Sequence, residues 1–151
     1  MIVLEHLDQD SSRWDQVAPN VEAWHPYTWP TVMLRMTTTP FVLLNGTTES
    51  GEAIGYVWFS LVTTTPRPVY SLHICVAPEW KGRWLTRTVL TQLLGYLYID
   101  MQASTVLAHH TDPDLRAILK RIGFTQHGAF INILDMEHPN GILSRHLRRW
   151  R

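Results

Sequence analysis

The sequence predicts an α/β protein in which helices lie on the faces of a mixed sheet. Two observations carry this prediction: apolar runs typical of strands stand before, between and after two helical stretches, and the helical stretches repeat apolar residues at a period near 3.6. A third observation is size, because 151 residues with 45% hydrophobic content can bury one core without disulfides. We therefore expect a single domain over residues 1–151.

The first forty residues combine a short strand, a helix and a proline-rich segment. Ile2–Leu4 is typical of a strand, and Asp10-Ser11-Ser12 can cap a helix that carries Trp14 and Val17. Prolines at 19, 26 and 30 interrupt this helix pattern. The aromatic segment 24–30 is expected to form an ordered loop or short helix, either as a hydrophobic cap or as a wall of a pocket.

Strand signals dominate residues 41–76. Turn residues separate three apolar runs, with Asn45-Gly46 opening the first turn and Pro66 and Pro68 marking the second; the runs are Phe41–Leu44, Ala53–Val62 and Val69–Val76. The last run is almost continuously apolar, which indicates burial on both faces.

Two helices and two further strands are expected in the remaining chain. Residues 83–100 repeat apolar side chains at 85, 89, 93 and 97, and Asp112-Pro113 starts a second helix that ends at Gly123. Strands are predicted at Ser104–Ala108 and Ala129–Asp135.

Three motifs, taken in order, resemble the GNAT superfamily of acyl-CoA N-acyltransferases over residues 41–135. They are a strand glycine followed by apolar residues in 53–57, the sequence Val76-Ala77-Pro78-Glu79-Trp80 at a strand end, and a strand, helix and Gly-Phe pair that closes with Gly123-Phe124. The resemblance implies an α+β fold with a central mixed, mostly antiparallel sheet and helices on both faces. It also implies acetyl-CoA as co-substrate and an amine as acceptor.

The resemblance implies where acetyl-CoA would bind. Its thioester would lie against the strand at Ile74 and Val76, its pantetheine arm near His110, and its phosphates at a helix N-terminus, where backbone N–H groups favour anions. The phosphate loop aligns with Lys81-Gly82-Arg83-Trp84-Leu85-Thr86. Trp84 and Thr86 replace family glycines, so the indole would either fill the pocket or swing outward.

Histidines are the candidate proton carriers. His73, on the fourth strand, is the candidate base because histidine titrates near neutral pH; the alternative is a strand histidine that faces solvent or is satisfied by a neighbour. His109 and His110 are candidates near the cofactor or loop histidines without a role. Leu119 stands where the family has a tyrosine that protonates the leaving thiolate, and leucine cannot donate a proton. A lone Cys75 and no ligand spacing predict no metal.

The charge and the targeting signals of the sequence limit which classes of partner are expected. The formal net charge is zero and no nucleic-acid recognition motif is present, although residues 145–151 hold four of the 13 basic residues. That tail and the aromatic segment 24–30 are the candidate surfaces for a protein partner, with a solvated helix end as the alternative for the tail. No apolar run predicts a membrane span and no leader is recognised, so a cytoplasmic location is expected.

Two functions stay open on the sequence. One is acetyl transfer from acetyl-CoA to an amine on a small molecule or a protein N-terminus. The other is a GNAT-fold protein without catalysis that acts as a binding or structural part, for example in a phage virion or against a host protein. Trp84, Thr86 and Leu119 favour the second function, while His73, Lys81 and Gly82 favour the first.

Overall fold

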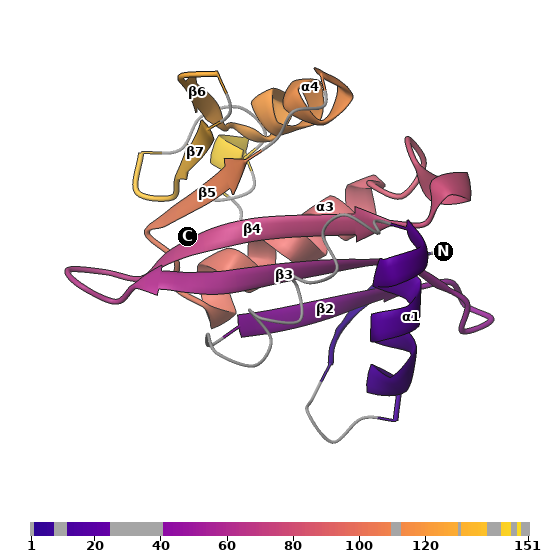
Figure 1. Cartoon of the computed structure of the whole chain (residues 1–151). Coiled ribbons are helices and arrows are strands. Elements are labelled where there is room, and N and C mark those ends of the chain that lie inside the picture. Colours follow the sequence, from indigo (N-terminus) through magenta and orange to yellow (C-terminus); the bar gives the residue numbers. More distant parts are fainter. Residues whose placement is uncertain are drawn as a thin grey trace. The chain divides into compact units, whose positions relative to one another are not determined.

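A computed structural model describes residues 2–7, 12–24, 41–109, 113–129, 131–138, 143–145 and 148. Strands stand before, between and after the helices in these residues, as the sequence predicts (Figure 1). The elements are β1 (Val3–His6), α1 (Trp14–Trp24), β2 (Phe41–Thr47), β3 (Ala53–Thr63), β4 (Val69–Val76), η1 (Pro78–Trp80), α3 (Arg87–Gly95), η2 (Tyr96–Asp100), β5 (Thr105–His109), α4 (Pro113–Ile122), β6 (Thr125–His127) and β7 (Ile131–Asp135).

The strands form a seven-stranded sheet in the order β1-β2-β3-β4-β5-β7-β6. β4 and β5 are parallel over Val69–Leu72 and Thr105–Ala108. The pairs β1/β2, β2/β3, β5/β7 and β6/β7 are antiparallel. The mixed, mostly antiparallel sheet that the resemblance implies is thus confirmed. No helix in the described part of the chain is long and apolar enough to cross a membrane.

The described contacts divide the chain into two compact units. The first comprises residues 1–60 and 73–92, and the second comprises residues 61–72 and 93–151. Both β3 and β4 contribute residues to each unit. The expectation of a single domain over residues 1–151 stays a prediction.

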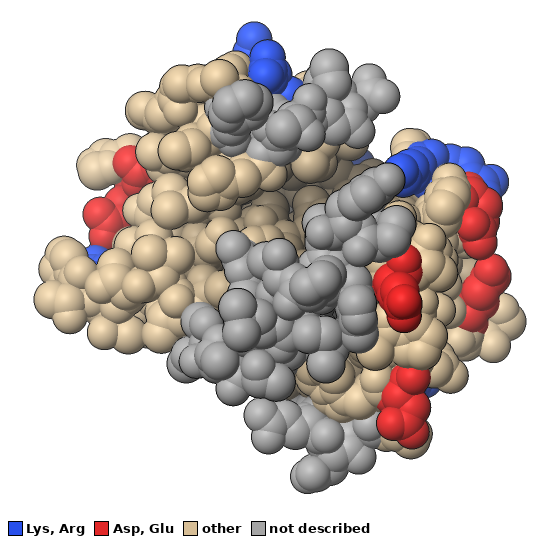
Figure 2. Space-filling model, viewed as in Figure 1, with Lys and Arg blue, Asp and Glu red and all other residues tan. Residues whose placement is uncertain are grey.

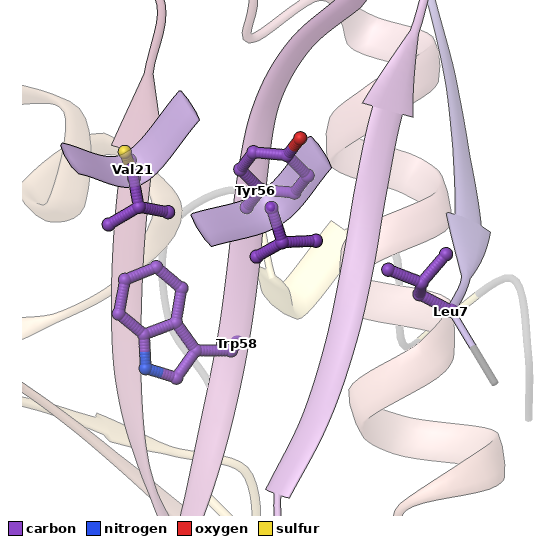
Figure 3. Close-up of a cluster of buried hydrophobic side chains, with 6 residues drawn as sticks. Leu7, Val21, Tyr56 and Trp58 are labelled. Atoms are coloured by element: carbon purple, nitrogen blue, oxygen red, sulfur yellow. The ribbon is translucent and has the colours of Figure 1, made fainter. Parts of the chain in front are cut away.

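The core of the first unit lies between α1 and the strands. Val17 and Val21 of α1 pack with Leu7, Tyr56, Trp58 and Cys75 (Figure 3). The partly buried Trp14 and Trp24 pack against this cluster. Figure 1 shows α1 on one side of β2 and β3, and the first part of α3 on the other side. Helices therefore cover both faces of this unit's strands.

The second unit is built on β5 and β7. Val106 and Ala108 of β5 are buried, as are Leu119 and Ile122 of α4, so the predicted apolar stripe of α4 is core. The buried Asn132 side chain donates to the Ala108 carbonyl at 3.4 Å, across the β5/β7 pair.

Several element bounds differ from the sequence prediction. Asn45-Gly46 does not open a turn, because β2 continues to Thr47 and pairs Gly46 with Gly55; the turn follows at residues 49–50. Pro19 lies inside α1, whose buried valines Val17 and Val21 hold the helix despite the lost N–H. The short strand β6, with three exposed residues, was not predicted.

Candidate functional site

The end of β4 lies unusually close to β3 at Gly55. A Cβ atom at Gly55 would lie 2.9 Å from the Cys75 carbonyl oxygen, a separation too short for any side chain. Just beyond β4, the Ala77 N–H donates to the Ile54 carbonyl at 2.9 Å. This hydrogen bond continues the contact between β3 and the chain that leaves β4.

Ile74 and Val76 lie on β4, one on each side of Cys75. The β4/β5 register ends at Leu72 opposite Ala108, so both residues lie beyond the paired part of β4. Their backbone groups are the ones that the family resemblance assigns to the thioester. The side chain of Ile74 is half-buried and that of Val76 is buried.

The loop after β4 presents two cations. Lys81 and Arg83 are exposed, and Gly82 between them has a φ of 79°, the left-handed region that favours glycine. The Arg83 guanidinium lies 4.7 Å from the Trp80 ring centroid, and its Nη2 donates to the Glu79 carbonyl at 2.8 Å. Arg83 is therefore held on the loop from two sides. Figure 2 shows basic side chains over the segment that follows β4, with acidic side chains beside them.

Trp84 does not lie across this loop. Its side chain is only 8% exposed, and it lines a small apolar cavity of about 10 Å³. The cavity is also lined by Ile2, Leu4, Gly46, Ile54, Gly55, Tyr56, Val57, Val76 and Val89. Of the two predicted positions for the indole, filling an anion pocket or swinging outward, the structure has neither, because the ring is part of the apolar core.

Thr86 caps α3. Its hydroxyl accepts a hydrogen bond from the Val89 N–H at 3.2 Å, and its carbonyl accepts one from the Leu90 N–H at 2.9 Å. The helix consequently begins at Arg87, and the expected start at residue 83 is wrong because 83–86 form the approach to the cap. Threonine is a preferred N-cap residue, so the sequence offered a signal for this helix start. Leu85, also expected to contact the cofactor, is half-buried.

His73 lies half-buried beside Trp58. The two rings are stacked, with centroids 5.2 Å apart and an interplanar angle of 14°. This contact agrees with a strand histidine that a neighbour satisfies, and the role of His73 as a base stays a prediction. Trp58 is 4% exposed, and its Nε1 has no hydrogen-bond partner among the described residues. The Ser60 hydroxyl, two residues along β3, is buried and unpartnered in the same way.

Tyr56 and Cys75 are two further groups in this core whose protonation depends on burial. Burial raises the pKa of Tyr56, although a hydrogen bond from Asn20 Nδ2 at 2.8 Å acts in the opposite direction. Burial also raises the pKa of Cys75 to about 12, with nearby Lys81 opposing this shift. Both groups are therefore protonated at neutral pH, and neither is a base.

The other predicted residues belong to the second unit or lie outside the described residues. His109 ends β5 in the second unit and is exposed, while His110 lies outside the described residues. Leu119 is 1% exposed in the core of the second unit. Residues 25–30 of the aromatic segment and most of the tail also lie outside the described part. The described residues contain no group of three or more His, Cys, Asp or Glu that could hold a metal ion.

Solved structures share this chain's fold over nearly its whole length. A chimera of the Vibrio cholerae spermidine N-acetyltransferase SpeG and hSSAT has a TM-score of 0.70 at 15% identity, covering 98% of this chain and 99% of that one. A point mutant of V. cholerae SpeG has a TM-score of 0.70 at 13% identity, with 99% and 98% covered. The chain has the GNAT fold.

A third structure extends the GNAT comparison beyond SpeG. A protein from Desulfovibrio desulfuricans that is assigned to the GNAT family has a TM-score of 0.62 at 16% identity, covering 89% of this chain and 99% of that one. No protein-family model matches the sequence, and no curated protein matches it either. At these identities the comparisons show the fold, while the activity has to be argued from the residues.

Proposed function

We propose that this GNAT-fold chain transfers acetyl from acetyl-CoA to a primary amine on a small molecule or a protein N-terminus. The observation that carries the proposal is the burial of Trp84. With the indole in the apolar core, Lys81, Gly82 and Arg83 form the exposed part of the loop that leads to the capped start of α3. Cations and helix N-terminal N–H groups are the partners that phosphate prefers.

In the proposed reaction, different residues bind the thioester and transfer the proton. In the proposal, the N–H groups of Ile74 and Val76 hold the thioester, where a hydrogen-bond donor stabilises the oxyanion that forms when the amine attacks the carbonyl carbon. His73 takes the proton from the ammonium form of the acceptor, directly or through water. The C–S bond then breaks, and the thiolate of CoA takes a proton.

The buried Leu119 gives specific support to a second function. A leucine that is 1% exposed in the core cannot protonate the thiolate, so that proton must come from water or another group. If no such group acts, the chain is a GNAT-fold binding protein, with residues 24–30 or the arginine-rich tail 145–151 as the contact surface for a protein partner.

A thermal-unfolding titration with acetyl-CoA and with CoA tests the first function. Ligand at about 100 times its Kd stabilises the folded state by roughly 2.7 kcal/mol. At this chain length, that raises the midpoint by about 5 to 10 °C. The double variant Lys81→Ala/Arg83→Ala should lose most of this rise. Lys120→Ala is the matched control, because Lys120 is the other lysine of the chain and lies exposed on α4.

The outcomes separate the two functions. A rise with both ligands, followed by CoA release with an amine from a panel that includes spermidine, supports acetyl transfer. A rise without CoA release for any amine supports the binding function. No rise at millimolar ligand contradicts a cofactor site in this chain.

A further inference from the structure

Two buried polar groups on β3 lack hydrogen-bond partners in the described part of the chain: Trp58 Nε1–H and the Ser60 hydroxyl. Their residues are 4% and 6% exposed. Buried polar groups in folded proteins are almost always paired, and an unpaired one costs stability. Two such groups two residues apart on one strand therefore mark a place where a bound oxygen, from water or from a ligand, would be stabilised.

Both groups belong to the same face of β3. Side chains alternate along a strand, so Tyr56, Trp58 and Ser60 point to one side. Figure 3 shows the ring nitrogen of Trp58 at the end of the indole that is turned away from Val21 and Tyr56. The N–H thus points out of the apolar cluster, and the Trp58 ring is stacked on the candidate base His73.

The chemistry of the two groups specifies what can satisfy them. An indole N–H can only donate, and a hydroxyl can donate or accept. An ammonium group has no lone pair, so it cannot accept from Trp58. The complementary group is an oxygen with free lone pairs, such as an amide carbonyl or a carboxylate.

We infer that Trp58 and Ser60 form an acceptor subsite, which selects amines that also carry a carbonyl or carboxylate oxygen. The oxygen accepts from Trp58 Nε1–H and from the Ser60 hydroxyl, while the amine lies toward His73. This inference rests on the proposed acetyl transfer. It predicts that spermidine, which has no oxygen, is a poor acceptor for this chain.

Matched amines test the selection. ω-Amino amides of three to five carbons are compared with their branched hydrocarbon isosteres, such as 4-aminobutanamide with 4-methylpentylamine, as acceptors of acetyl from acetyl-CoA. One hydrogen bond to an otherwise unpaired buried donor predicts about a tenfold preference in kcat/KM for the amide. Trp58→Phe keeps the ring and should reduce the preference to within about twofold. Ser60→Ala should reduce it in part.

A binding readout makes the test independent of turnover. The chain has seven tryptophans, so a ¹H–¹⁵N spectrum shows their indole N–H signals, and Trp58→Phe identifies the Trp58 signal by its loss. Adding 4-aminobutanamide should move that signal, and 4-methylpentylamine should not. Trp14→Phe is the matched control, since it removes an indole from the edge of the same cluster and should leave the preference unchanged.

Each outcome bears on the inference. Acetylation of amide and isostere at equal rates overturns the subsite and leaves acetyl transfer standing. A preference that survives Trp58→Phe also overturns it. If no amine is acetylated, a selective shift of the Trp58 signal still supports the subsite, and an unmoved signal overturns it. Absence of a thermal shift with acetyl-CoA, by contrast, contradicts the proposed function.

Discussion

Replacing Trp84 by alanine separates a core role from a blocking role for this residue. The side chain is 8% exposed, and a buried tryptophan removes about 150–250 Å² from water. At about 25 cal/mol per Å², this burial contributes roughly 4 to 6 kcal/mol, in line with the 3–5 kcal/mol typical of Trp→Ala in cores. Taking about 4 kcal/mol, Trp84→Ala should lower the thermal midpoint by about 8 to 16 °C.

Urea unfolding and the acetyl-CoA titration together check the Trp84 prediction. Trp84→Phe, which retains an aromatic ring, should lose less stability than the alanine variant. Trp80→Ala is the matched control, because Trp80 is half-buried and its ring contacts Arg83. This variant should lower the midpoint of the free protein less than Trp84→Ala does, and it should reduce the rise in midpoint that acetyl-CoA causes. A Trp84→Ala protein with an unchanged midpoint and tighter acetyl-CoA binding would refute the core assignment, because it would mean that the indole blocks the loop.

Three further changes have expected results. Gly55→Ala should destabilise by about 1–3 kcal/mol in urea unfolding, since its methyl group meets the Cys75 carbonyl at 2.9 Å, whereas Gly46→Ala, with a nearest contact of 3.4 Å, should cost much less. Thr86→Ala should cost about 1 kcal/mol through loss of the α3 cap, and equal costs for Thr86→Ala and the exposed Thr88→Ala would contradict the cap. Because burial raises the pKa of Cys75 from 9.0 to about 12, its contribution to stability is complete below pH 9 and is lost as pH rises to 12. Urea unfolding at pH 8 and pH 10.5 should therefore show a smaller decline for Cys75→Ala than for the natural chain.

The order and type of the elements could be predicted from the sequence because periodicity is a local property. The strand pattern of 53–62 and the apolar stripe of α4 both appear in the structure as predicted. The predicted first and last residues of the elements were wrong where tertiary contacts determine where an element begins or ends. Gly46 is a turn signal in isolation, but here it lies within β2 and pairs with Gly55 of β3, a long-range pairing that local sequence does not reveal.

The loop that carries the candidate site could be located from the sequence, but the directions of its side chains could not. The positions of Lys81 and Gly82 follow from the strand-loop-helix pattern, and the structure leaves both exposed. The direction of Trp84 could not be deduced, since an aromatic residue in a loop can enter the core or cover a pocket. The unpaired Trp58 and Ser60 were also out of reach, because hydrogen-bond satisfaction depends on neighbours that are distant in sequence.

The fixed position of Arg83 has a consequence for how an anion would be recognised. An arginine held by the Trp80 ring and the Glu79 carbonyl has already lost much of its rotational freedom, so an incoming phosphate need not immobilise it. The planar guanidinium group then offers pairs of N–H donors that can bind two phosphate oxygens at once, which the ammonium group of lysine cannot do. Substituting lysine for Arg83 should therefore slow capture only slightly, because the charge remains, and should shorten the lifetime of the bound state.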